Sequence, residues 1–155
     1  MADHIVFLQQ ALVVAGRSLE KGNLPFGCIL VSPYGNILAE GENTVLTSND
    51  AIAHCEINLV QQLKGKYSPE FLQQCIVYAS TEPCAMCAGA IFWTGIGTIV
   101  YALSKEQYHQ ISGTVNPAHV LNMKAEELLS RGGRKVTVLG PLLEEEATAF
   151  YNSCR

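Results

Sequence analysis

Apolar residues recur at helical spacing in the first twenty positions of the chain and then give way to short runs typical of strands. The helical positions are Ile5, Leu8, Ala11, Leu12, Ala15 and Leu19, and this period predicts a helix. Asp3 is suited to cap its start and Gly22 to end it. Two strands are predicted next, over residues 26–31 and 36–40, with a turn between them at Pro33, Tyr34 and Gly35.

Helices and strands alternate through the rest of the chain. The pattern predicts a helix from near Asp50 to about Leu63, a buried strand over 75–79, a helix ending near Gly95 and a strand over 98–102. After Ser104 it weakens to a helical stretch over 125–130, a strand over 136–139 and a terminal helix from about Leu142. This alternation predicts an α/β fold, a three-layer α-β-α domain around a central mixed sheet of about five strands.

Size and composition indicate one globular domain, which we expect to span residues 1–155. The chain has 155 residues, of which 48% are hydrophobic and 15% charged, as is typical of a domain with a single core. No segment is long and apolar enough to suggest a membrane span, and an N-terminal stretch containing Asp3 and Gln9-Gln10 is unlike a signal peptide. We therefore expect a cytoplasmic protein.

Six cysteines are present. Four of them are scattered, mostly among apolar neighbours, namely Cys28, Cys55, Cys75 and Cys154. Reduced thiols in a reducing compartment are the simplest interpretation of this placement. The other two cysteines form a motif of their own.

Two short segments carry the residue types of a zinc site. They are His54-Cys55-Glu56 and Pro83-Cys84-Ala85-Met86-Cys87. Catalytic zinc is usually held by three protein groups, with its fourth position left to water, whereas structural zinc has four protein ligands. His54, Cys84 and Cys87 make three ligands, and Glu56 is left as a group that can move protons. The inventory predicts a catalytic zinc site.

The spacing within each motif indicates where the ion would lie. Cys84 and Cys87 stand at i and i+3, so in a helix both sulfurs emerge on one face. Pro83 suits the start of such a helix, where the helix dipole favours thiolates. His54 and Glu56 are two residues apart, so within an ideal helix their side chains would point about 200° away from each other. They can face the same site only at the end of a helix. We expect the zinc off the N-terminal tips of two neighbouring helices.

Two other interpretations explain fewer of these residues. A C-x-x-C pair in a soluble protein can be a redox pair, but then His54 and Glu56 have no role. A non-catalytic module can keep zinc for its stability, but it would not need Glu56, and a fourth protein ligand would be expected.

Both motifs resemble the paired zinc motifs of the cytidine deaminase-like superfamily, in particular its branch of guanine deaminases, tRNA adenosine deaminases and fungal-type cytosine deaminases. The similarity covers roughly residues 3–103. Segments that fit it besides the motifs are Pro25-Phe26-Gly27, Gly41-Glu42-Asn43 and Asn49-Asp50. The resemblance implies a zinc-dependent aminohydrolase that replaces an exocyclic amino group of a heterocyclic base with oxygen and releases ammonia.

The resemblance also implies contacts to the substrate. In the family, the asparagine at the position of Asn43 hydrogen-bonds the substrate, an aromatic at Phe26 lies against the base, and the backbone at Cys55 helps to bind the ring. Relatives mostly carry alanine where this chain has Cys55, whose side chain we expect to point away from the metal. Members of this kind form homodimers whose neighbouring chain helps to close the pocket, so a homodimer is expected.

A guanine-like purine is the favoured substrate, because the pair Phe92-Trp93 resembles the guanine deaminase branch. That branch recognises guanine with an acidic residue after the C-x-x-C helix. In this chain the only acidic residue between positions 103 and 120 is Glu106. Candidates for a displaced recognition residue are Glu144, Glu145 and Glu146, although a solvated helix start, which favours negative charge, is the simpler account of them. Cytosine and nucleosides stay open as alternatives. Trp93 and Tyr108 are candidate stacking residues, for which core packing is the simpler account.

Transfer RNA is the rival substrate, through deamination of adenosine to inosine. The chain has 10 Lys and Arg against 14 Asp and Glu, a formal net charge of −4, whereas proteins that grip an RNA backbone usually carry a basic patch. The one basic cluster, at Arg131, Arg134 and Lys135, is typical of a surface turn. A small heterocyclic base or nucleoside is therefore ranked above nucleic acid.

Overall fold

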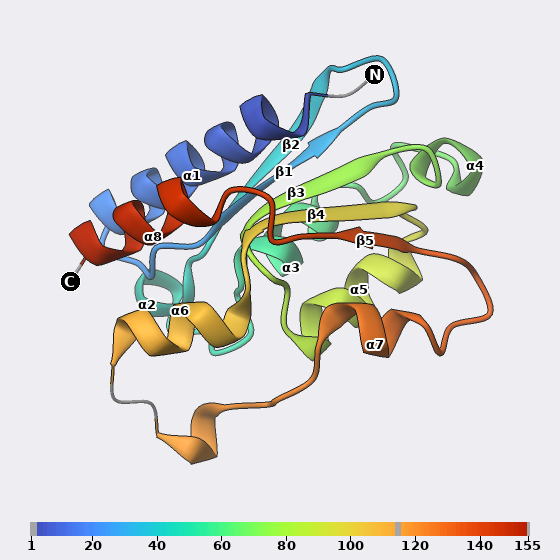
Figure 1. Cartoon of the computed structure of the whole chain (residues 1–155). Helices are drawn as coiled ribbons and strands as arrows, with labels where there is room; N and C mark the ends of the chain where they lie inside the picture. The colour runs from blue at the N-terminus through green and yellow to red at the C-terminus, as the bar shows by residue number, and fades with distance from the viewer. Residues whose placement is uncertain (1–2, 114–115, 155) are drawn as a thin grey trace.

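A five-stranded sheet forms the centre of the computed structural model, which describes residues 3–113 and 116–154. The strands lie in the order β2-β1-β3-β4-β5 (Figure 1). β1 runs antiparallel to β2 and β3, whereas β3, β4 and β5 are parallel. The predicted mixed sheet is confirmed, with strands β1 Gly27–Val31, β2 Ile37–Glu42, β3 Ile76–Thr81, β4 Thr98–Leu103 and β5 Thr137–Leu139.

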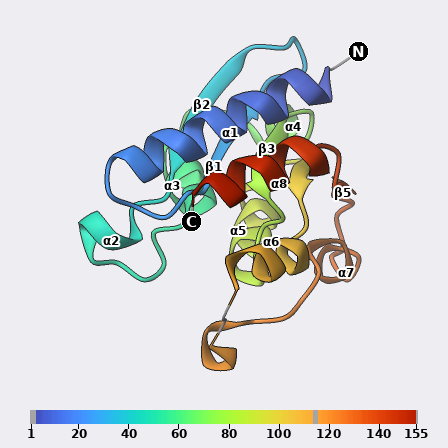
Figure 2. The same cartoon turned by 60° about the vertical axis from the view of Figure 1, so that its left-hand side comes forward.

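Helices cover both faces of the sheet, which confirms the three-layer α-β-α arrangement. One face carries α1 (His4–Glu20) and α8 (Glu144–Ser153), which lie side by side in Figures 1 and 2. The opposite face carries α3 (Cys55–Gln61), α5 (Ala85–Thr94) and α7 (Ala125–Leu129). The connection from β3 through α5 to β4 is a parallel βαβ unit, the type of crossover that the alternation of strands and helices predicts.

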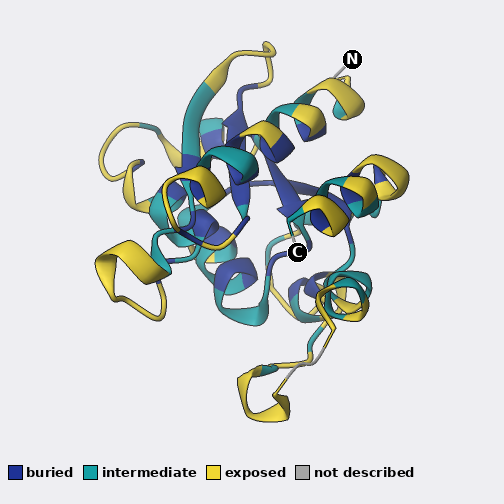
Figure 3. Cartoon of the chain, turned by 90° about the vertical axis from the view of Figure 1, so that its left-hand side faces the viewer, coloured by how far each residue is buried: buried dark blue, intermediate teal, exposed yellow. Residues whose placement is uncertain are grey.

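The core consists of two apolar layers, one on each face of the sheet. Successive residues of β1 alternate between them, as the pleat of a strand requires: Cys28 and Leu30 pack towards α3 and α5, and Ile29 packs towards α1. All five residues of β1 are buried. Figure 3 shows the buried strands inside and the exposed surfaces of α1 and α8 outside.

The first helix follows its sequence signals. Asp3 is its N-cap, and the Asp3 side chain accepts a hydrogen bond from the backbone N–H of Val6 at 3.3 Å. Gly22 follows the helix with a φ of 92°, a conformation that glycine adopts without steric cost. Both predicted ends of this helix are confirmed.

The predicted helix from near Asp50 to Leu63 is wrong at its start. A short helix, α2 (Val45–Ser48), comes first, and α3 begins only at Cys55 with His54 as its N-cap. Between them the Asp50 side chain accepts a hydrogen bond from the backbone N–H of Ile52 at 3.1 Å. Such an aspartate-led turn competes with helix, and the apolar pattern does not reveal it.

Besides α2, three elements were not expected from the pattern: α4 (Pro69–Leu72), α6 (Lys105–Ser112) and a 3-10 turn at Pro117–His119. α6 has a proper cap, because the Ser104 hydroxyl accepts a hydrogen bond from the N–H of Gln107 at 3.1 Å. Its apolar contribution to the core is only Tyr108 and Ile111, too few to give a clear period. The terminal helix begins at Glu144, two residues later than expected. Within the described residues, every helix is too short or too polar to cross a membrane.

Candidate metal and active site

The candidate site lies where three strand ends and two helix starts meet. Cys84 is the N-cap of α5 and follows the carboxyl end of β3. His54 is the N-cap of α3. Because β1 is antiparallel to both of its neighbours, its first residues lie beside the last residues of β2 and β3. Pro83 directly precedes the N-cap of α5 and so lies two positions before Ala85, the first residue of the helix.

The three expected ligands converge. The Nδ1 atom of His54 lies 3.6 Å from Sγ of Cys84 and 3.6 Å from Sγ of Cys87. One ligand atom from each residue lies within 4.8 Å of the others, and this is the group of His, Cys, Asp and Glu that the described residues bring together for a metal ion. Cys87 is fully buried, whereas His54 and Cys84 are half-buried. The two sulfurs therefore share a site, as their spacing predicted.

These distances fit a zinc ion. Zinc bonds are about 2.3 Å long to sulfur and about 2.0–2.1 Å to nitrogen, so in a tetrahedral site the nitrogen lies about 3.6 Å from each sulfur. The observed separations of 3.6 Å have this value. One imidazole and two thiolates are also ligands that suit zinc, unlike the oxygen ligands that magnesium or calcium prefers. Three protein ligands leave room for a fourth, non-protein one.

The two thiols form a coupled pair. The hydrogen bond with Cys87 lowers the pKa of Cys84 to about 4, and the contact with His54 lowers it too. The hydrogen bond with Cys84 and burial raise the pKa of Cys87. This contact favours the thiolate form of Cys84, which accepts a hydrogen bond from the protonated Cys87, and a divalent cation would bind both as thiolates.

Glu56 stands in the first turn of α3, outside the three-ligand group. Its side chain is almost completely buried, with 6% of the residue exposed. Burial raises the pKa of the Glu56 carboxyl, while hydrogen bonds from the Cys55 thiol and from its own backbone N–H lower it. A carboxyl group with a raised pKa is suited to both accept and donate a proton.

The side chain of Cys55 does not belong to the metal group. Its Sγ lies 2.9 Å from Oε1 of Glu56, to which the thiol donates a hydrogen bond. Burial raises the pKa of Cys55 well above its usual value. The backbone of Cys55 begins α3, where N–H groups have no intrahelical partner.

Asn43 and Phe26 are brought together by backbone pairing. The N–H of Asn43 donates to the carbonyl of Phe26 at 3.1 Å. The side-chain oxygen of Asn43 accepts a hydrogen bond from the N–H of Val45 at 3.0 Å. This assignment of the amide follows from its hydrogen bonds, and it leaves the NH₂ group of Asn43 as a donor. Asn43 is 1% exposed, so its orientation is fixed by the surrounding protein.

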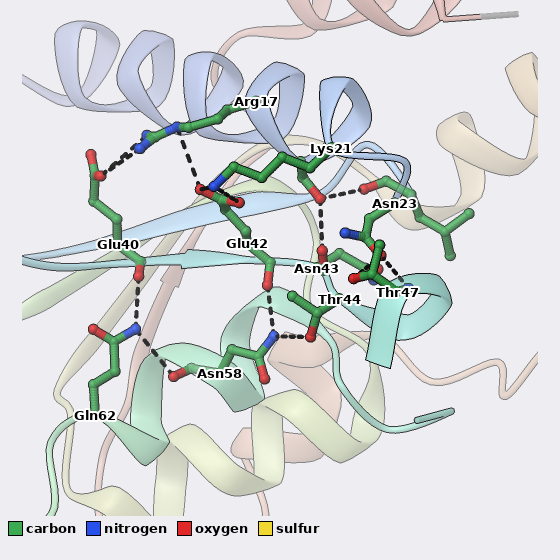
Figure 4. Close-up of polar contacts among 12 residues, drawn as sticks. Arg17, Lys21, Asn23, Glu40, Glu42, Asn43, Thr44, Thr47, Asn58 and Gln62 are labelled. Carbon is green, nitrogen blue, oxygen red and sulfur yellow. Dashed lines mark hydrogen bonds and ion pairs between the residues drawn. The ribbon is translucent and has the colours of Figure 1, made fainter. Parts of the chain in front are cut away.

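Polar side chains of α1 and α3 hold the strand that leads to Asn43 (Figure 4). Arg17 pairs with Glu40 at 3.1 Å and with Glu42 at 3.5 Å, and Lys21 pairs with Glu42 at 2.9 Å. From the other side, the Asn58 amide donates to the backbone carbonyl of Glu42 at 2.7 Å. The end of β2 is therefore fixed between two helices. A buried hydroxyl, that of Ser18, completes this arrangement at 2.8 Å from the carbonyl oxygen of Asn43.

Phe26 lies in an aromatic cluster. Its ring centroid is 5.0 Å from that of Tyr108 and 6.2 Å from that of Tyr151. Tyr108 comes from α6 and Tyr151 from α8, so the last third of the chain supports the ring expected to face the substrate. The sequence pattern gave no reason to select Tyr151, because its role depends on where α8 packs.

Other residues singled out by the sequence lie elsewhere. Trp93 is 84% exposed on α5. Glu144, Glu145 and Glu146 are exposed in the first turn of α8 and line a surface hollow of about 590 Å³ that contains none of the expected site residues. Arg134 donates hydrogen bonds to the carbonyls of Phe92 and Ile96 at the end of α5. The basic cluster is thus partly used inside the fold.

Glu82 is a buried carboxylate that sequence reasoning missed. One of its oxygens accepts the N–H of Lys105 at 3.2 Å, and the other accepts the N–H of Ala125 at 2.9 Å. Glu82 therefore joins the starts of α6 and α7 to the segment that carries Cys84. Its position directly before Pro83 in the motif was the only available signal.

Comparison with known proteins is consistent with this site. Residues 1–103 match the family model described as the cytidine and deoxycytidylate deaminase zinc-binding region. A probable cytosine deaminase of Schizosaccharomyces pombe is 32% identical over 143 residues, covering 92% of this chain and 86% of that protein. The guanine deaminase of Bacillus subtilis is 40% identical over 101 residues, which cover 64% of each.

Two further similarities extend the comparison. A tRNA-specific adenosine deaminase of Streptococcus pyogenes is 32% identical over 108 residues, covering 70% of this chain and 67% of that protein. The solved structure of a guanine deaminase from Nitrosomonas europaea has a TM-score of 0.78 at 23% identity, covering 99% of this chain and 84% of that one. This last likeness supports the fold over the whole described chain, including the part beyond residue 103.

Proposed function

Because this chain belongs to the family that shares the cytidine and deoxycytidylate deaminase zinc-binding region, and is thus a zinc-dependent deaminase, we propose that it removes the exocyclic amino group of a free nucleobase. A guanine-like purine is the first candidate substrate. The observation that carries the proposal is the convergence of His54, Cys84 and Cys87 beside the buried, unligated Glu56. A site with three protein ligands and a nearby acid-base group is built for hydrolysis.

We propose His54, Cys84 and Cys87 as the zinc ligands. Zinc bound there supplies a Lewis acid that lowers the pKa of water from about 15.7 towards 7. Glu56 takes a proton from the attacking water and delivers protons to the ring nitrogen and to the departing amino group, which leaves as ammonia. General acid-base catalysis of this kind typically contributes about 10²- to 10⁴-fold in rate.

Asn43 and Phe26 position the ring in this proposal. Since the oxygen of Asn43 is engaged by the N–H of Val45, Asn43 offers N–H donors, and it would recognise an acceptor on the base. Phe26 supplies an aromatic face, and the backbone N–H of Cys55 is a further donor. A base without an acceptor at this place should bind less well, because the buried N–H donors of Asn43 would be left without a partner.

Cytosine is the second candidate substrate. The relative in Schizosaccharomyces pombe, a probable cytosine deaminase, matches 92% of this chain. The guanine branch is expected to have an acidic recognition residue, and Glu106, Glu144, Glu145 and Glu146 are all exposed. For both reasons cytosine has to be assayed together with guanine.

Transfer RNA is ranked below the free bases. The net charge of −4 disfavours a polyanionic substrate, and the guanidinium of Arg134 is engaged by carbonyls of the fold. The tRNA-specific relative nonetheless makes tRNA a necessary part of the assay.

We also propose a cytoplasmic homodimer. All six cysteines are free thiols, which suits a reducing compartment. Trp93 is 84% exposed on a helix of the site, and covering such a side chain favours association. Sedimentation equilibrium of the zinc-loaded protein should give twice the chain mass, and a monomer at micromolar concentration would contradict the dimer.

An ammonia-release screen tests the proposed function. The purified, zinc-loaded protein is incubated with guanine, cytosine, adenine, their nucleosides and unmodified tRNA, and ammonia is measured over time. We expect release from a free base, with guanine first. Release from tRNA alone would reverse the ranking, and no release from any of them would favour a non-catalytic zinc module.

A further inference from the structure

The most unusual contact in the site is the one between a thiol and the carboxylate expected to move protons. Sγ of Cys55 lies 2.9 Å from Oε1 of Glu56. Cys55 is 2% exposed and Glu56 is 6% exposed. Among the side-chain hydrogen bonds of residues 3–113 and 116–154, this is the one that reaches the Glu56 carboxylate. The thiol is therefore its side-chain partner inside the protein.

Cys55 is held in place from behind by the β1–β2 pair. Cys28 on β1 is paired with Gly41 on β2. A Cβ atom at Gly41 would lie 2.2 Å from the carbonyl oxygen of Cys55 and 3.0 Å from Sγ of Cys28. The absence of a side chain at Gly41 thus allows the first turn of α3 to approach the strand, which fixes the backbone that carries the thiol.

We propose that Cys55 is a positioning residue, whose thiol holds one oxygen of Glu56 and leaves the other free to transfer protons. The proposal deepens the proposed function and rests on the role of Glu56 in it. A glutamate has three side-chain torsions, and a carboxylate that must accept a proton at one place and deliver it at another works best in one orientation. The Cys55 thiol is the donor of this contact, with its Sγ 2.9 Å from Oε1 of Glu56.

This role differs from simple filling of space. If Cys55 served only for packing, serine and alanine would both be tolerated or both destabilise the fold. If it orients Glu56, the donor is what matters, and a hydroxyl can replace the thiol. The loss of one such hydrogen bond is expected to lower kcat about 3- to 10-fold. KM should change little, because the Cys55 thiol donates to Glu56 and the backbone N–H proposed to contact the substrate stays in place.

The variants Cys55→Ala and Cys55→Ser test the proposal, with Cys75→Ala as the matched control. Cys75 is also fully buried, and its thiol donates to the carbonyl of Phe71 at 3.4 Å, but it lies just before β3, at the strand end opposite the site. We expect Cys55→Ala to lower kcat about 3- to 10-fold. Cys55→Ser and Cys75→Ala should stay near the parent kcat, and all variants should keep one zinc per chain.

A second comparison uses the Glu56→Gln background. Because Cys55 acts through the ionisable carboxyl group, Cys55→Ala should cause no further loss of turnover once Glu56 is replaced. An equal loss in both backgrounds, a parent-like kcat for Cys55→Ala, or an equal loss in Cys55→Ser would each overturn the proposal.

A spectroscopic readout separates this proposal from the proposed function. The S–H stretching band of Cys55 is assigned by its disappearance in Cys55→Ser, and it should shift to higher frequency when Glu56 is replaced by leucine. If the parent protein releases no ammonia, the proposed function fails whatever the band does. If the parent is active and the band does not shift, only the positioning role of Cys55 is overturned.

Discussion

Glu82 offers the most informative perturbation of the scaffold that supports the site. Its two carboxylate oxygens accept the N–H groups of Lys105 and Ala125, at 3.2 and 2.9 Å. Glu82 is 8% exposed and Ala125 is fully buried. Replacement by alanine leaves both N–H groups without their acceptor, at about 1–3 kcal/mol for the buried N–H of Ala125 and less for the partly buried N–H of Lys105. We therefore expect Glu82→Ala to lower the free energy of unfolding by about 2–5 kcal/mol.

Urea denaturation of the zinc-loaded protein measures this effect. With an m-value of about 2 kcal/mol per M, the loss moves the midpoint down by roughly 1–2.5 M. Glu82→Gln keeps one acceptor oxygen and should lie between the parent and Glu82→Ala. Glu126→Ala is the control, because Glu126 is an exposed carboxylate in the first turn of α7 and is worth less than about 1 kcal/mol there. A Glu82→Ala midpoint equal to that of Glu126→Ala would refute the reasoning.

Three further outcomes are expected. Glu56→Gln should lower kcat by about 10²- to 10⁴-fold while one zinc per chain remains by elemental analysis, and retained turnover would disprove the proton-transfer role. Cys87→Ala should lose the metal, whereas Cys75→Ala should keep it; full zinc occupancy in Cys87→Ala would show that the ligand set is wrong. Gly41→Ala should destabilise the protein by about 1–3 kcal/mol, since its Cβ would lie 2.2 Å from a backbone oxygen, and Gly133→Ala, with open space around it, should unfold near the parent midpoint.

Local sequence was sufficient for the elements with a clear period or a clear end signal. The first helix, with Asp3 as its cap, and the helix that ends at Gly95 appear where the sequence places them. Weakly periodic segments were not predictable. α6 buries few apolar residues, and the turn before α3 depends on the side chain of Asp50, so neither leaves a periodic pattern of apolar positions.

The chemistry of the site was determined by the sequence to the extent that it resides in closely spaced residues. Two cysteines at i and i+3 can reach one ion, and a histidine two residues before a glutamate needs a helix end for both side chains to face the same site. His54 and Cys84 are indeed the N-caps of α3 and α5. The identity of the three candidate ligands therefore needed no knowledge of the fold, because residue type and local spacing determine what can reach a common metal ion.

Only the tertiary structure decided which distant residues support the site. Tyr151 reaches Phe26 because α8 packs beside α1, and Glu82 caps α7 across more than forty residues of chain. The direction of the Cys55 thiol depends on how closely α3 approaches Gly41. Such contacts depend on how layers pack against each other, and packing between elements far apart in sequence leaves no periodic trace in either of them.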